Sequence, residues 1–285
     1  MKKNKKTQEQ RDSLIAQSND LAKARYNYSL WEFRIFVEML QTIKEDDKEF
    51  KKVRLYYSDF AKVYQSDGRN DYRRITKAIK ALGRKIMFVP YIDPETKEER
   101  EFSDWIIKVD IPKHIDDGHK KYADLIFNDG LKPLLLELSA NYFLYDKINI
   151  LKIKGKYTFV FYQFFKAIER EDRDKMVVTL TIKKIRAMIL VDPEGNPTNQ
   201  YERLSDLERY LIKPVQKELK EKTDIRITYE KVKEGKKVKA LCFTLYKNRK
   251  NRPKEQQFKS IKIQQETTKQ QPRPKAPKRQ PSTVK

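Results

Sequence analysis

The sequence predicts an α+β protein in which one order of secondary-structure elements occurs twice and is followed by a disordered basic tail. Two observations predict this. Apolar residues recur first with helical and then with alternating spacing, in the same succession, in each half of residues 12–250. The stretch 249–285 is rich in proline, glutamine and basic residues, a composition that cannot bury enough apolar surface to offset the entropy of ordering.

The first half contains a complete set of elements. In chain order we expect a helix over 29–43, a strand over 53–57, a helix through Tyr64, a longer helix from Tyr72 to about Met87, and hairpin strands over 88–92 and 105–111. Ser58-Asp59 and Asp71 are expected to cap the two later helices, because short polar side chains accept hydrogen bonds from a helix N-terminus.

The second half follows the same order. We expect a strongly apolar helix over 157–168, a strand over 177–180, a helix over 182–190, a long helix over about 201–222, and hairpin strands over 224–231 and 238–246 joined by the turn 233–236. Thr181 is expected to cap the shorter helix. Pro214 lies inside the long helix and predicts a kink, because proline removes one helical hydrogen bond.

Helix, strand, helix, helix and hairpin is the order of a winged helix, a helix-turn-helix followed by a β-hairpin wing. The apolar positions of the two long helices also align, for example Ile75 with Leu204 and Leu82 with Leu211. We therefore predict two tandem winged-helix domains that arise from an internal repeat. The predicted segments are a basic arm 1–12, a first domain 13–145, a second domain 146–248 and the tail 249–285.

The charge balance favours a nucleic-acid partner. The 285 residues include 64 Lys and Arg against 41 Asp and Glu, a net charge of +23. No run approaches the roughly 20 apolar residues of a membrane span, so no membrane partner is expected. The basic N-terminus lacks the apolar region of a secretory signal. With Cys242 as the single cysteine, neither an intramolecular disulfide nor a cysteine-based zinc site is expected, and a cytoplasmic location is indicated.

The sequence lacks the spacings of common catalytic sites. None of the seven glycines falls in a phosphate-binding or dinucleotide-binding pattern. His114 and His119 are five residues apart, which places them off a common helix face. We expect no catalytic residue, no cofactor and no bound metal.

Candidate DNA-binding residues lie on the long helix of the second half, beside an apolar stripe that runs from Leu204 to Leu219. The residues expected to contact bases, where arginine can fork to guanine, are Arg203, Ser205, Asp206 and Arg209. The residues expected to contact phosphates are Lys213, Lys217, Lys183, Lys184, Arg186, Lys236, Lys237, Arg73, Arg74 and Lys77. Each set is equally compatible with an ordinary solvated face, with ion pairs such as that of Glu208 with Lys213 nearby.

The stretches 18–26, 30–34, 125–138, 157–168 and 201–223 are distinctive together, in their order and spacing. In these stretches the chain resembles the iteron-binding plasmid replication initiators, the Rep family with two winged-helix domains. The family's recognition-helix positions fall on Arg203, Ser205, Asp206 and Arg209. Glu208 stands where relatives are expected to carry a basic residue, and a carboxylate there would repel phosphate or read cytosine.

The resemblance implies a DNA-binding initiator without catalytic activity of its own. Such proteins bind repeated double-stranded sites in a plasmid origin, promote its opening, and recruit the host initiator ATPase and the replicative helicase. The resemblance also implies a monomer–dimer equilibrium through the first domain, with dimers repressing their own promoter, and a cytoplasmic, nucleoid- or plasmid-associated location.

Three other functions remain open. A winged-helix transcriptional regulator would need the same DNA surface. A rolling-circle nickase would need clustered histidines and a tyrosine nucleophile, and the spacing of the two histidines argues against it. An RNA-binding protein would need aromatics exposed on a sheet, whereas aromatics such as Phe161 and Phe165 lie where a core would use them.

Overall fold

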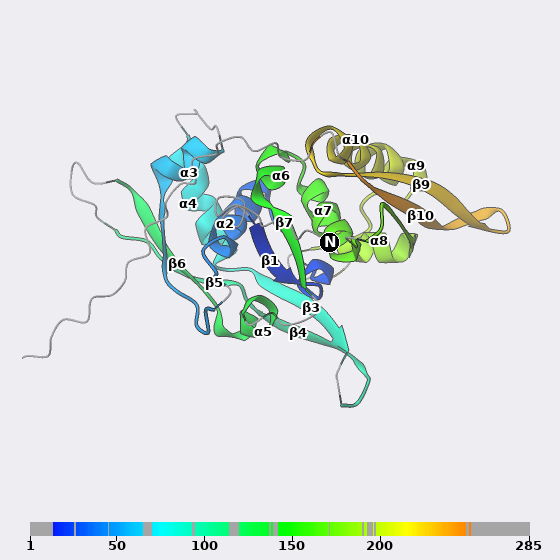
Figure 1. The fold of residues 1–285 in the computed structure, drawn as a ribbon. Helices are drawn as coiled ribbons and strands as arrows, with labels where there is room; N and C mark the ends of the chain where they lie inside the picture. The colour runs from blue at the N-terminus through cyan, green and yellow to red at the C-terminus, as the bar shows by residue number, and fades with distance from the viewer. Residues whose placement is uncertain are drawn as a thin grey trace, which may run out of the picture.

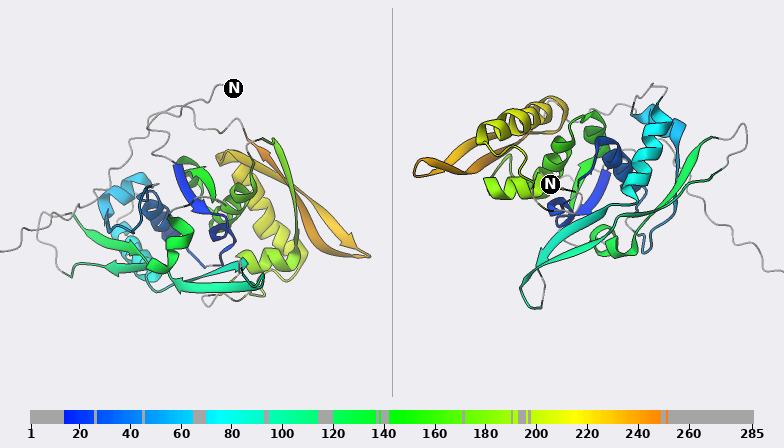
Figure 2. Two further views of the ribbon diagram at one scale, coloured as in Figure 1. Left: turned by 60° about the horizontal axis from the view of Figure 1, so that its bottom comes forward. Right: turned by 180° about the vertical axis from the view of Figure 1, so that it is seen from behind.

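The computed structural model describes residues 14–25, 27–44, 46–64, 70–92, 95–113, 120–136, 138, 142–170, 172–189, 191–192, 196, 198–248 and 251. The predicted N-terminal arm and, apart from Asn251, the predicted tail lie outside these residues, as do His114 and His119. The fold is α+β. Figures 1 and 2 show α3 (Tyr57–Val63) and α4 (Asp71–Leu82) at one end and α9 (Leu204–Leu207) and α10 (Lys213–Lys222) at the other. Between them lie α7 (Lys156–Ile168), β1 (Leu14–Ser18) and β7 (Tyr142–Asp146).

Within the described residues, the first part of the chain combines helices with three small antiparallel sheets. Its elements are β1 (Leu14–Ser18), η1 (Leu21–Lys23), α2 (Leu30–Leu40), β2 (Val53–Tyr56), α3 (Tyr57–Val63), α4 (Asp71–Leu82), β3 (Ile86–Ile92), β4 (Glu99–Trp105), β5 (Ile107–Asp110), β6 (Tyr122–Phe127), η2 (Asp129–Leu131), α5 (Lys132–Leu135) and β7 (Tyr142–Asp146). The sheets are β1-β7, β3-β4 and β2-β6-β5. The helix α2 begins where it does because Ser29 and Glu32 form a reciprocal capping box.

The second part repeats this plan. Its elements are α6 (Lys147–Lys152), α7 (Lys156–Ile168), β8 (Lys175–Thr181), α8 (Ile182–Ile189), α9 (Leu204–Leu207), the π-helical turn η3 (Glu208–Ile212), α10 (Lys213–Lys222), β9 (Ile225–Glu234) and β10 (Lys237–Lys247). The three strands form one antiparallel sheet in the order β8-β10-β9. The β9–β10 hairpin projects from the body as a wing (Figure 1).

The wing of the first unit is not the hairpin that alternation predicted. The predicted strand 105–111 is broken at Ile106, which is fully buried, and its two parts belong to different sheets. The order β2-β6-β5 matches β8-β10-β9, so β5 and β6 correspond to the wing strands, and β3–β4 is an additional hairpin between α4 and this wing. Alternation reveals a strand but not its partner, because pairing depends on residues far apart in the chain.

Helix ends differ from the predictions for local reasons. The helix α4 ends at Leu82 rather than near Met87, with Gly83 following, and Met87 belongs to β3. Ser58 and Asp59 lie inside the first turn of α3, and Asn70 occupies the N-cap position ahead of Asp71, so these predicted caps are wrong.

The predicted long helix is continuous but begins at Leu204 rather than Tyr201. The helix contains a wider π turn directly before Pro214. In that turn the Lys213 N–H donates to the Glu208 carbonyl five residues back, and Pro214 itself has no N–H to donate.

The helix α7 is shared by the two halves of the molecule. All residues from Thr158 to Phe165 are buried, as expected of a helix that is covered on every side. Towards the first half, the Phe159 ring stacks on Phe33 of α2 with centroids 4.9 Å apart. Towards the second half, the Phe161 and Phe165 rings lie 6.0 and 5.6 Å from Phe243 of β10. One helix therefore supplies core side chains to both units.

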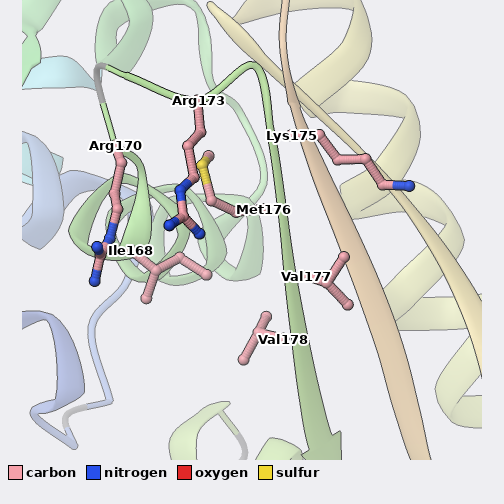
Figure 3. Close-up of a pocket in the computed structure, with 7 residues that line it drawn as sticks. All are labelled: Ile168, Arg170, Arg173, Lys175, Met176, Val177 and Val178. Carbon is pink, nitrogen blue, oxygen red and sulfur yellow. The ribbon is translucent and has the colours of Figure 1, made fainter.

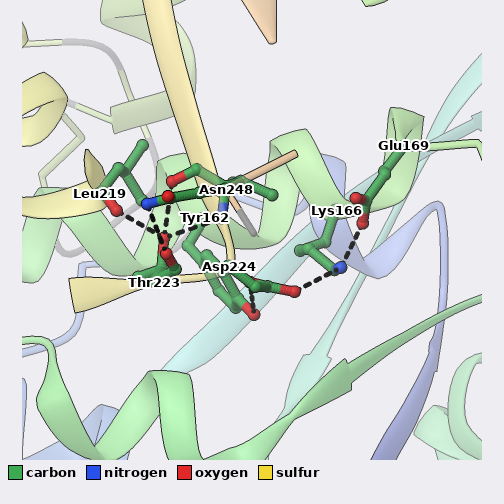
Figure 4. Close-up of polar contacts among 8 residues, drawn as sticks. Tyr162, Lys166, Glu169, Leu219, Thr223, Asp224 and Asn248 are labelled. Atoms are coloured by element: carbon green, nitrogen blue, oxygen red, sulfur yellow. Dashed lines mark hydrogen bonds and ion pairs between the residues drawn. The ribbon is translucent and has the colours of Figure 1, made fainter. Parts of the chain in front are cut away.

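Polar contacts also join α7 to the end of α10 (Figure 4). The Asp224 carboxylate accepts hydrogen bonds from the Tyr162 hydroxyl at 2.9 Å and from the Lys166 ammonium at 3.0 Å. The Asn248 amide donates to the carbonyls of Lys220 and Thr223 at 2.8 and 3.0 Å. Burial would lower the pKa of Lys166, but the carboxylates of Asp224 and Glu169 outweigh it and hold that pKa above its ordinary value.

A glutamate of α10 caps the N-terminus of α7. The Glu218 carboxylate accepts hydrogen bonds from the backbone N–H groups of Lys154 and Gly155 at 2.7 and 3.1 Å and from the Thr158 hydroxyl at 2.7 Å. A Cβ on Gly155 would lie 2.7 Å from this carboxylate, so a larger residue there would displace the Glu218 carboxylate from its present position. Burial alone would raise the pKa of Glu218; hydrogen bonds from Lys222, Lys154 and Thr158 lower it below its ordinary value.

We predict that Glu218→Gln lowers the free energy of unfolding by about 1–2 kcal/mol at pH 7, since it removes a charged cap. Because the folded-state pKa lies below the unfolded one, the stabilisation is present above the unfolded pKa. It is lost as pH falls through the folded-state pKa. Urea unfolding of wild type and variant at pH 7 and pH 3 measures the difference in their free energies of unfolding. This difference should be smaller at pH 3 than at pH 7.

The control is Glu221→Gln, an exposed glutamate on the same helix. An equal gap between wild type and Glu218→Gln at both pH values would contradict the assigned role of the carboxylate charge.

Candidate nucleic-acid interface

The helix-turn-helix of the second unit is built from α8 and the helix 204–222. The Thr181 hydroxyl accepts from the Lys184 N–H at 3.1 Å, which confirms the predicted cap of α8. The predicted apolar stripe of the longer helix is buried from Leu207 through Leu219. Packing of this stripe fixes which side of the helix remains exposed.

That exposed side carries most of the predicted base-contacting and phosphate-contacting residues of this helix. Arg203, Ser205, Arg209, Lys213 and Lys217 are exposed, and Asp206 is partly exposed. The structure therefore brings these residues together along one continuous helix, and their contacts with DNA remain predictions.

The other predicted phosphate contacts form three separate groups. Lys183 and Lys184 are exposed on α8, and Lys236 and Lys237 are exposed at the wing turn. Gly235 begins that turn with φ +59°, a conformation that glycine adopts without strain. Arg73, Arg74 and Lys77 are exposed on α4 in the first unit.

Arg186, predicted to contact phosphate, has partners within the protein. Its guanidinium donates to the backbone carbonyls of Tyr201 and Glu202 at 2.7 and 2.5 Å. Tyr201 has φ +57°, a conformation that is uncommon for a residue with a side chain. Arg186 therefore stabilises the turn that leads into the helix 204–222, and its contact with phosphate stays a prediction.

Glu208 is likewise occupied by the protein. Its side chain is 12% exposed, and its carboxylate accepts from the Tyr229 hydroxyl at 2.9 Å and the Lys231 ammonium at 2.8 Å, both on β9. This corrects the expectation of an ion pair with Lys213 or a free carboxylate facing DNA.

The pKa shifts of Glu208 and Tyr229 agree with this geometry. Burial and then the Glu208 carboxylate raise the pKa of Tyr229 to about 12. Burial would raise the pKa of Glu208, but Lys231 and Tyr229 hold it below its ordinary value. Glu208 thus links the helix 204–222 to the wing.

Sequence reasoning missed Tyr210. It is 52% exposed although it is a large aromatic residue on the same helix. Its ring stacks on Tyr201 at 5.9 Å, and the Arg209 guanidinium lies 5.3 Å from its centroid. The signal was an aromatic residue outside the apolar stripe. Tyr210 limits the orientations open to Arg209 through a cation–π contact.

Other kinds of site find no support in the part of the chain that the structure describes. No helix there has the length and apolarity to cross a membrane. Nor do three or more His, Cys, Asp or Glu side chains lie together as a metal-binding group within those residues.

Comparison with protein families decides the relationship of the chain. The family model described as "Initiator Replication protein, WH1" matches residues 14–166, and that described as "Initiator Rep protein, WH2" matches residues 194–245. The chain belongs to the winged-helix initiator replication proteins. This confirms the predicted fold of two winged-helix domains, and the first match ends inside α7, the helix that both units share.

Individual initiators are distant in sequence. A replication initiation protein of Escherichia coli is 19% identical over 227 residues, which cover 76% of this chain and 65% of that protein's length. The crystal structure of the Pi initiator protein in complex with iteron DNA has a TM-score of 0.65 at 18% identity. It matches 83% of this chain and 98% of the Pi chain. The structural similarity to the Pi initiator shows that the two proteins share a fold.

We predict that Glu208→Ala loosens the wing locally. Loss of about 1–2 kcal/mol of local stability should speed amide hydrogen exchange of Tyr229–Lys231 about 5–30-fold. Exchange followed by mass spectrometry measures it. Glu230→Ala, an exposed glutamate on the same strand, serves as the control; identical exchange in the two variants would show that Glu208 does not hold the wing.

Proposed function

We propose that this protein is a plasmid replication initiator that binds directly repeated double-stranded sites, iterons, in its origin. Family membership supports the proposal, as does the fold shared with an initiator crystallised with iteron DNA. The observation that carries it is the exposed face from Arg203 to Lys217, on a helix whose back is buried and whose ends are fixed by side-chain contacts.

In this proposal the helix 204–222 enters the major groove. Arg203 and Arg209 read guanine, Ser205 and Asp206 contact bases or orient the arginines, and Lys213 meets phosphate. Further phosphate contacts come from α8 and the wing turn. Arg73, Arg74 and Lys77 on α4 form a second contact that reads little sequence, and the net charge of +23 favours association with DNA in general.

The wider function follows the resemblance to the Rep family. Bound copies promote origin opening and recruit the host initiator ATPase and the replicative helicase, with no catalysis by this chain and no cofactor. A monomer–dimer equilibrium through residues 13–145 lets dimers repress the protein's own promoter. The protein acts in the cytoplasm on plasmid DNA.

Unbiased selection of duplex DNA by the purified full chain at about 150 mM salt tests the proposal, because non-specific phosphate binding is weakened there. A defined site that recurs in tandem in the protein's own replicon supports an initiator. A defined site that occurs singly at a promoter favours the transcriptional regulator instead. If the selection recovers no common sequence, the helix 204–222 does not read bases and the assignment of its residues is wrong.

We predict that Arg209→Ala weakens the free energy of binding to the selected site by about 1–3 kcal/mol and relaxes the base preference at one base pair. Lys213→Ala should weaken selected and unrelated duplexes alike and reduce the salt slope by about one, because it meets phosphate. Titrations at several salt concentrations measure both effects. Lys108→Ala, exposed on β5, is the control; unchanged affinity and preference in Arg209→Ala would mean that this side chain does not read the site.

A further inference from the structure

The strand β8 forms an edge of the second unit's sheet. In the order β8-β10-β9 it pairs with β10 alone, and no strand within the described residues covers its other side. In an antiparallel strand, alternate residues turn their backbone N–H and C=O groups away from the neighbour, so an edge can accept a further strand.

An open hollow of about 620 Å³ lies beside this edge. Its lining residues are Ile168, Arg170, Arg173, Lys175, Met176, Val177 and Val178. Figure 3 shows the side chains of Arg170 and Arg173 pointing the same way beside Ile168, on the side of β8 that carries Met176 and Val178. Val177, on the other side of the strand, is 58% exposed. Two arginine side chains thus lie beside apolar side chains, next to the open edge of β8.

The position of the hollow separates it from the wing turn, and its lining differs from that of a phosphate site. Val177 pairs with Thr244, near the end of β10 that is distant from the wing turn. Lys237 and Thr244 are seven residue steps apart, about 20–25 Å in extended conformation. A phosphate backbone offers no apolar group to the exposed Val177, whereas an extended peptide presents carboxylates on one face and apolar side chains on the other.

Charge indicates which peptide the hollow suits. Asp172 lies 3.9 Å from the Arg173 Nε, and both side chains are largely exposed, so this ion pair is weak and a partner's carboxylate can replace it. The chain's own terminal segments, 1–12 and 249–285, are basic and would be repelled by the two arginines. The complementary occupant is therefore acidic, which excludes these two terminal segments.

We propose that β8 and this hollow dock an extended segment of a partner protein in which acidic and apolar side chains alternate. The segment adds to the sheet as a fourth strand, its backbone pairs with β8, its carboxylates on one face bind Arg170 and Arg173, and its apolar side chains on the other face contact the exposed Val177. This inference goes beyond the proposed function, because it concerns a protein partner and not DNA.

The test uses the full chain and a fluorescein-labelled eight-residue peptide that alternates Glu with Val. Anisotropy titrations compare it with a Lys-Val alternating peptide and with a peptide of four Glu followed by four Val. The variant Arg170→Glu with Arg173→Glu is compared with a charge-matched control, Arg100→Glu with Lys108→Glu, at exposed positions of the first unit. Circular dichroism confirms that both double variants fold.

The proposal expects the alternating acidic peptide to bind best and the Arg170/Arg173 variant to bind it at least about tenfold more weakly, a change of about 1.4 kcal/mol. The control variant should stay within about twofold for the peptide, and both variants should match each other on duplex DNA. Equal binding of the block peptide, or no loss in the Arg170/Arg173 variant, overturns the proposal.

Two other occupants give distinct results that also overturn it. A phosphate site would appear as a loss of duplex affinity confined to the Arg170/Arg173 variant. A second copy of the chain would appear in sedimentation as wild-type self-association that this variant abolishes while the peptide fails to compete.

Discussion

The burial of α7 between the two winged-helix units is the constraint on which the rest of the structure depends. Its aromatic residues cannot be covered by one unit, because Phe159 stacks on Phe33 of α2 while Phe161 and Phe165 meet Phe243 of β10. Separating the units would expose rings on one side or the other, at a cost of several kcal/mol. The two basic helices, α4 and the helix 204–222, are therefore held on one body rather than on two tethered modules.

From α7 a chain of polar contacts leads to the proposed DNA surface. Glu218 and Asp224 join the helix 204–222 and its C-terminal end to α7, Glu208 joins the same helix to the wing, and Arg186 holds the turn before it. Each contact involves a charged group with several hydrogen bonds, the kind of interaction that is costly to break when one partner is removed. The orientation of the exposed face thus rests on buried and half-buried residues behind it.

The sequence predicted what depends on local periodicity and missed what depends on distant pairing. Apolar spacing predicted α2, α4, α7 and the helix 204–222, and the alternation of 238–246 predicted β10. The prediction of the first wing was wrong because β5 pairs with β6, about fifteen residues later, and the β3–β4 hairpin lies between α4 and this wing. Arg186 and Glu208 look like surface charges in the sequence; their partners come from the Tyr201 turn and β9, so their roles follow only from the fold.

The central claim is that α7 makes the two units unfold as one. Both tryptophans, Trp31 and Trp105, lie in the first unit, so their fluorescence reports that unit, whereas far-ultraviolet circular dichroism reports the helices of both. Urea unfolding of the full chain followed by both signals is the direct measurement. We expect a single transition in which the fluorescence and circular dichroism midpoints coincide. Circular dichroism that continues to change after the fluorescence transition is complete would show that the second unit unfolds independently, and would contradict the claim.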